Sequence, residues 1–228
     1  MSPATRRVLS MAVLAAFAWV FWSTIWLAPI RLLVVVFHEA GHALMAVLTG
    51  GEVMGIEVGL NEGGRTLTRG GSEFLILNGG YLGSLVTGVL LLASVKKPGR
   101  GRYVAGALGI VLMGIALFWF RPILSFGFLY ASVLGFLLSL VSAYAPDWFS
   151  DGFVRFIGLF SALYALVDIQ DDVFRLGLFG GSWYADGPVV TDAHLLASMT
   201  GIPSPIWGVG WLCVGAATLW LTRRWTTL

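Results

Sequence analysis

Charged residues are scarce in this 228-residue sequence. Only 11% of its residues are charged and 57% are hydrophobic, whereas about a quarter of the residues in an ordinary soluble domain are charged. The mean hydropathy of +0.85 points the same way. This composition argues against a water-soluble fold. The few basic residues lie in small clusters at the chain ends and in loops, so no continuous basic face is available and nucleic acid is not an expected partner.

Cysteine is nearly absent as well. Cys213 is the only one, which excludes an internal disulfide and a cysteine metal cluster. The sequence also has only three histidines, and two of them stand in one short segment.

What the sequence does contain is a series of apolar runs of about twenty residues, the length that a helix needs to cross a bilayer. The runs cover residues 8–27, 29–48, 74–95, 103–120, 123–144 and 205–221, with one more between residues 147 and 180. They predict an all-α polytopic membrane protein with six or seven transmembrane helices, folded as a single membrane domain over residues 1–228. The first run is too long for a signal peptide, and we expect it to be retained.

Two short segments interrupt this pattern. Residues 50–71 combine the β-branched Val53, Ile56 and Val58 with a turn-like stretch at 61–64, which predicts a β-hairpin. Residues 180–204 are polar for this chain and predict an interfacial segment with a short helix, capped by Thr191 and Gly201.

The strongest chemical signal is the segment His38-Glu39-Ala40-Gly41-His42, in the middle of the second apolar run. Two histidines four residues apart project from one face of a helix and can bind one zinc ion. Glu39 then lies where a general base would take a proton from water at the metal. The alternative is that the three are satisfied polar residues of a helix bundle, but each ionisable group is costly at mid-bilayer unless it is paired or bound to metal.

A catalytic zinc usually has three protein ligands and an open position, so a third ligand must come from elsewhere. Asp168 is our first expectation and Asp172 the alternative, because both lie at the end of a span that must carry charge. Only twelve residues separate Arg155 from Asp168, too few to cross the bilayer. Asp192 and His194 form a rival pair, although their polar setting favours helix capping and exposure to solvent.

The HEAGH segment, followed by Gly51-Glu52-Val53, resembles the site-2 protease type of intramembrane zinc metallopeptidase. Residues 78–84 (NGGYLGS) and 191–194 (TDAH) are similar to the short bacterial and plant branch of that family, the B-like branch. The resemblance implies His38 and His42 as zinc ligands, Glu39 as the general base, a membrane-embedded aspartate as third ligand, and a strand able to pair with an unwound substrate. Val167-Asp168-Ile169 stands where the family's Leu-Asp-Gly motif is expected.

We therefore predict an integral membrane metalloprotease with one zinc ion, in a bacterial cell membrane, that hydrolyses peptide bonds in or near transmembrane segments of other proteins. Asn78 is a candidate for binding the substrate backbone, or else a helix cap. Two alternatives remain. One is a catalytically silent membrane protein that uses the same metal site to bind a partner, and the other is a metal transporter, which should have more ligand-bearing helices than the two found here.

Overall fold

The computed structural model describes residues 9, 13, 20–21, 24–169 and 191–222. Most of the predicted span at residues 8–27 lies outside the described residues, and so do residues 170–190, which include Asp172.

The described part of the chain is mainly helical. Its long helices are α2 (Ala28–Leu48), α3 (Glu73–Ser94), α4 (Gly101–Trp119), α5 (Phe126–Tyr144), α6 (Asp147–Ile169) and α8 (Ser204–Thr222), with a short α7 (Asp192–Thr200) and a 3-10 turn, η1 (Ile25–Leu27). Among the described residues, five helices, α2 with η1 and α3 to α6, are long and apolar enough to cross a membrane. The predicted fold class is confirmed.

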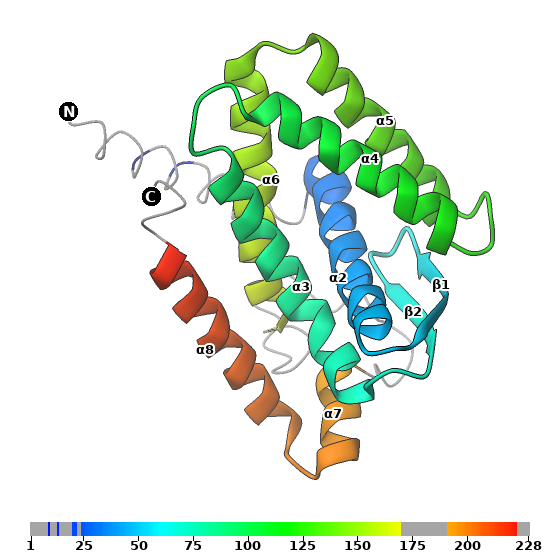
Figure 1. Ribbon diagram of the computed structural model, residues 1–228. Coiled ribbons are helices and arrows are strands. Elements are labelled where there is room, and N and C mark those ends of the chain that lie inside the picture. Colours follow the sequence, from blue (N-terminus) through cyan, green and yellow to red (C-terminus); the bar gives the residue numbers. More distant parts are fainter. Residues whose placement is uncertain (1–8, 10–12, 14–19, 22–23, 170–190, 223–228) are drawn as a thin grey trace.

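Helix α2 lies at the centre of the arrangement (Figure 1). It packs against α3, α6 and both strands of a hairpin, while α4 pairs with α5, and α7 and α8 contact each other and α3. Glycines allow α2 and α3 to approach closely: a Cβ atom on Gly41 would lie 2.1 Å from the carbonyl oxygen of Gly79, and one on Gly83 would lie 2.8 Å from the Cα atom of Gly41. Gly41 belongs to the HEAGH segment, so this close contact lies at the predicted metal site.

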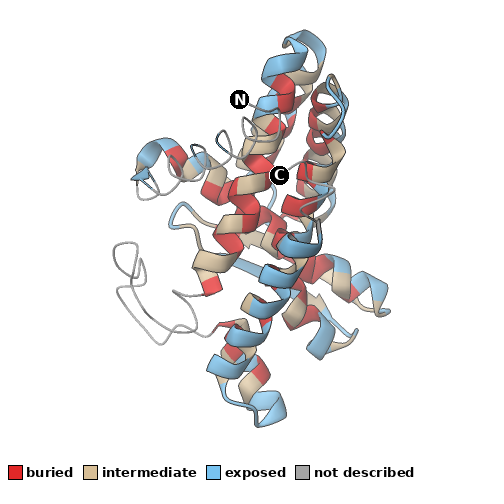
Figure 2. Ribbon diagram, turned by 90° about the vertical axis from the view of Figure 1, so that its left-hand side faces the viewer, coloured by how far each residue is buried: buried red, intermediate tan, exposed pale blue. Residues whose placement is uncertain are grey.

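The burial of residues follows the packing of the helices. Buried residues lie along the inner faces of the helices, and exposed residues along the outer faces (Figure 2). Helices α4 and α5 are the most exposed candidate spans, with only 28% and 22% of their apolar windows buried. Their outer faces carry large apolar side chains such as Ile110, Phe118, Val133 and Phe136. Such faces are suited to contact with lipid.

The predicted hairpin is present and follows α2 directly. Strand β1 (Glu52–Val58) pairs antiparallel with β2 (Gly64–Arg69), with a register shift between Val53 and Gly55. Gly50, Gly70 and Gly71, at the base of the hairpin, all have positive φ angles, a conformation that glycine adopts at little cost. On its other side, β1 forms a bridge between Ile56 and Phe120, and the Arg121 amide donates to the Ile56 carbonyl. The outer edge of β1 is thus partly covered.

Candidate metal centre

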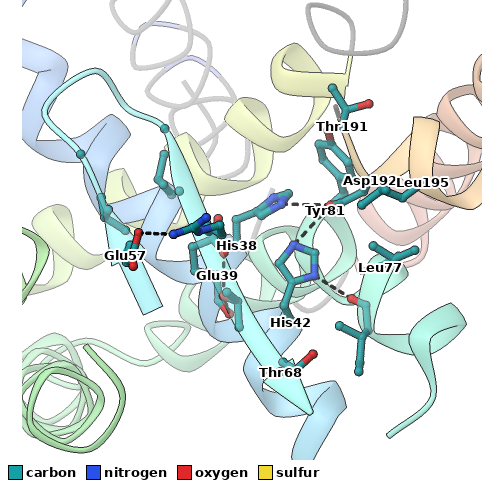
Figure 3. A pocket seen from close by; sticks show the side chains of 18 of the residues that line it. His38, Glu39, His42, Glu57, Thr68, Leu77, Tyr81, Thr191, Asp192 and Leu195 are labelled. Atoms are coloured by element: carbon teal, nitrogen blue, oxygen red, sulfur yellow. Dashed lines mark hydrogen bonds and ion pairs between the residues drawn. The ribbon is translucent and has the colours of Figure 1, made fainter. Parts of the chain in front are cut away.

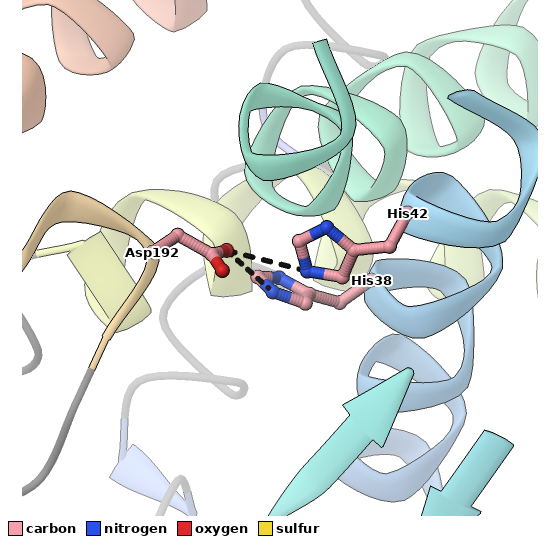
Figure 4. A group of neighbouring side chains, drawn as sticks. All are labelled: His38, His42 and Asp192. Carbon is pink, nitrogen blue, oxygen red and sulfur yellow. Dashed lines mark hydrogen bonds and ion pairs between the residues drawn. The ribbon is translucent and has the colours of Figure 1, made fainter. Parts of the chain in front are cut away.

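Three side chains from two distant parts of the chain converge beside α2 (Figure 4). The Nε2 atoms of His38 and His42 lie 3.2 Å and 3.3 Å from the same oxygen, Oδ2 of Asp192. Among the described residues, these are the three whose potential ligand atoms all lie within 4.8 Å of one another. The spacing of the two histidines on α2 has the predicted result, since both rings face the same point.

Neighbouring groups fix the orientation of both rings. The Nδ1 atom of His42 lies 2.7 Å from the backbone carbonyl oxygen of Ile76 on α3. Because a carbonyl can only accept, Nδ1 carries a proton and donates it, so Nε2 is the ring nitrogen that faces the convergence point. The ring of Tyr81 packs edge-on against His38, with 4.7 Å between ring centroids. A hydrogen bond from the second ring nitrogen to a carbonyl is the usual support of a metal-binding histidine.

Gly80 leaves space beside the ligand nitrogens. A Cβ atom at this position would lie 2.3 Å from Nε2 of His38 and 2.6 Å from Nε2 of His42. Two imidazole nitrogens, a carboxylate oxygen and the space next to them form a donor set that fits zinc or a similar divalent transition metal.

Asp192 reaches the histidines because it begins α7, which packs against α3. Burial alone would raise the pKa of its carboxyl, but the neighbouring imidazoles of His42 and His38 hold that pKa below its usual range. The lowered pKa favours the ionised form of the carboxyl, which is the form that can serve as an anionic ligand. The predicted caps of α7 are where they were expected: Thr191 precedes the helix, and Gly201 ends it in the left-handed conformation.

The structure brings Asp192, and not Asp168, into the group with the two histidines. Asp168 lies in the last turn of α6 and lines the same cavity, but its carboxylate is not part of the three-residue cluster. The expectation that Asp192 serves mainly as a cap does not hold, because its carboxylate faces the imidazoles. His194, the other half of the rival pair, points elsewhere and shares a hydrogen bond of 2.8 Å between its Nδ1 atom and the Thr191 hydroxyl. Two features of the sequence pointed to Asp192: its place beside His194 in the rival pair, and the similarity of residues 191–194 to the B-like branch.

Asn78, the candidate for binding the substrate backbone or capping a helix, forms two hydrogen bonds in this structure. Its side chain donates to the carbonyl of Phe74 and accepts a hydrogen bond of 2.8 Å from the indole N–H of Trp211 on α8. It is not among the residues that line the cavity at the histidines. In this structure Asn78 connects α3 to α8.

Glu39 lies between the histidines and the hairpin (Figure 3). The residue is only 5% exposed. Its Oε2 atom accepts a hydrogen bond of 2.6 Å from the hydroxyl of Thr66 on β2. Gly64, on the same strand, leaves room for this carboxylate, because a Cβ atom there would lie 2.3 Å from Oε1 of Glu39.

A cavity of about 1050 Å³ joins these parts. His38, Glu39, His42 and Asp192 line it together with apolar side chains such as Ile76 and Leu77 and with the hairpin from Glu57 to Thr68. A potential metal site and a buried carboxylate thus open onto one space beside a β-strand.

Comparison with known proteins agrees with this geometry. A family model described as Peptidase M50B-like matches residues 10–222, nearly the whole chain. No curated protein and no solved structure matches the chain significantly.

Proposed function

This chain belongs to the Peptidase M50B-like family, a site-2 protease-like family, and from that premise we propose that it is a zinc metalloprotease that cleaves transmembrane segments of other membrane proteins. The family and the five apolar helices make it a multi-pass membrane protein. The observation that carries the proposal is the convergence of His38, His42 and Asp192 beside the buried carboxylate of Glu39.

The residues of the chain divide the work of hydrolysis. His38, His42 and Asp192 would hold the zinc ion, so that Asp192 takes the role first expected of Asp168 or Asp172. When bound, zinc would supply a Lewis acid that polarises the scissile carbonyl and lowers the pKa of a water molecule. The Glu39 carboxylate is the general base that accepts the proton of the attacking water, and in its protonated form it can donate that proton to the leaving amine.

The hairpin supplies the surface for an extended substrate. A transmembrane helix must unwind before hydrolysis, because its carbonyls are already hydrogen-bonded within the helix. Phe120 and Arg121 partly cover the outer edge of β1, whereas β2 lines the cavity through Gly64, Thr66 and Thr68. We therefore assign β2 as the strand that pairs with the unwound substrate by strand addition.

A bacterial cell membrane is the proposed location, and a single-span membrane protein is the proposed partner. The test uses the full chain in detergent, mixed with a library of synthetic single-span peptides of about 20 apolar residues. New peptide termini are detected by mass spectrometry, and zinc is measured in the same preparation.

Wild-type protein should cleave a subset of these peptides, and the Glu39→Gln variant should retain zinc but lose cleavage by at least about 100-fold. Cleavage that persists in Glu39→Gln would remove Glu39 from the mechanism. Zinc binding without cleavage of any peptide by the wild type would favour the silent, partner-binding alternative.

A further inference from the structure

We propose that Thr66, on strand β2, is a positioning residue that orients the carboxylate of Glu39 for proton transfer. This inference rests on the proposed function, because it concerns the same general base. It goes further in giving the hairpin a part in catalysis that is separate from substrate pairing.

The contact between Thr66 and Glu39 is short. The 2.6 Å between the Thr66 hydroxyl and Oε2 of Glu39 lies in the range of a hydrogen bond from a hydroxyl to an ionised carboxylate. The same hydroxyl lies 3.1 Å from the backbone carbonyl oxygen of Glu39. Both acceptors belong to Glu39, and the shorter contact is the one to the side-chain oxygen. Thr66 thus holds one oxygen of the base in a fixed place.

A second residue of the strand is adapted to the same carboxylate. Gly64 is two positions before Thr66, so both lie on the same face of β2. A Cβ atom at Gly64 would lie 2.3 Å from Oε1 of Glu39 and 2.8 Å from both its Cγ and its Cδ atoms. The strand therefore supplies a hydroxyl to one oxygen of Glu39 and open space to the other, and any larger residue at Gly64 would displace the carboxylate.

The strand is itself held against α2 at the far end of the hairpin. Glu62, in the turn between β1 and β2, forms a bidentate ion pair with Arg31 on α2, with distances of 2.7 Å and 2.8 Å. The side chains of Arg31 and Glu62 are only 6% and 17% exposed. Arg31 lies two helical turns before His38, on the same side of α2. The ion pair thus fixes the hairpin along the helix that carries the metal ligands and the base.

The functional consequence concerns the rate of the chemical step and not the affinity for substrate. A base displaced by about 1 Å can lose about 100-fold in rate, whereas contacts between the strand backbone and the substrate are unaffected by the loss of one hydroxyl. We expect Thr66→Val, which has nearly the same shape but no hydroxyl, to lower kcat about 10- to 100-fold with KM changed less than about twofold. Thr66→Ser restores the hydroxyl and should recover most of the rate.

The experiment uses the full chain in detergent and the peptide that the wild type cleaves fastest. It measures kcat, KM, bound zinc and the thermal unfolding midpoint for the wild type, Thr66→Val, Thr66→Ser and Gly64→Ala. Thr87→Val is the matched control, because it makes the same chemical change in α3 at a residue that does not line the cavity. Gly64→Ala should also lower kcat, because its Cβ atom would displace the Glu39 carboxylate while the hydroxyl of Thr66 is still present. This variant should retain zinc.

The outcomes separate the two proposals. A lower kcat in Thr66→Val, with unchanged zinc and recovery in Thr66→Ser, supports the positioning role. If Thr66→Val cleaves as fast as the wild type, or if Thr66→Ser is as slow as Thr66→Val, the positioning role is overturned while the protease assignment stands. If the unfolding midpoint and kcat fall together and KM rises, Thr66 is a structural residue only. A wild type that cleaves no peptide contradicts the protease assignment itself and this inference with it.

Discussion

The Nδ1 atom of His42 lies 2.7 Å from the backbone carbonyl oxygen of Ile76, which ties the metal-site helix α2 to its neighbour α3. One turn further along α3, Gly80 leaves the space that lies next to both ligand nitrogens. Helix α3 therefore shapes the site in two ways, by orienting a ring and by leaving room beside it.

Replacing Gly80 with alanine should remove metal binding while the protein stays folded. The added Cβ atom would lie 2.3 Å from Nε2 of His38, so the imidazole must move away from its partners. Alanine is favoured over glycine inside a helix by about 1 kcal/mol, so α3 itself is not weakened. Zinc content and the thermal unfolding midpoint of the Gly80→Ala variant test this prediction.

Gly114→Ala is the control for that experiment, because a Cβ atom there would meet nothing within 4 Å. It should bind as much zinc as the wild type. If Gly80→Ala retained full zinc occupancy as well, the space beside the histidines would have no role in metal binding.

The ion pair between Arg31 and Glu62 should matter for stability. Both side chains are largely buried, and removing one partner of a buried pair commonly costs about 3–5 kcal/mol, because the other charge is left uncompensated. We expect Glu62→Gln and Arg31→Met each to lower the unfolding midpoint in detergent, and the double variant to recover part of the loss. Strictly additive losses in the double variant would show that the two side chains are not coupled.

The hydrogen bond between Asn78 and Trp211 should hold α8 against α3. Asn78→Ala leaves the Trp211 indole N–H without this acceptor, which should reduce stability by about 1–3 kcal/mol. Zinc content and KM should not change, since Asn78 does not line the cavity. A raised KM at unchanged stability would instead favour the substrate-binding role, one of the two that the sequence left open for Asn78.

Much of the fold could be predicted because it depends on local patterns. The lengths of the apolar runs predicted the spans that correspond to helices α2 to α6 and α8. The β-branched residues flanked by glycines predicted the hairpin. The spacing of His38 and His42 determines the relation of their rings on any helix, so the structure brings them together as expected.

The partner of the two histidines depends on tertiary structure and could not be deduced in the same way. The sequence favours Asp168 because it lies at the end of a span that must carry charge, and the length and charge of a span can be read from the sequence. Asp192 is 154 positions from His38, and its approach requires that α7 fold back against α3. The roles of Thr66 and Gly64 also depend on the exact register of β2 against α2, which the hairpin pattern does not determine.

Metal analysis of three proteins tests the central claim most directly. Wild type, Asp192→Ala and Asp168→Ala are purified in detergent, dialysed against a weak chelator and assayed for zinc. The wild type and Asp168→Ala should retain about one zinc ion per chain, whereas Asp192→Ala should lose most of it, because Asp192 is the carboxylate that joins His38 and His42 among the described residues. Retention of zinc by Asp192→Ala together with its loss from Asp168→Ala would contradict the proposed site.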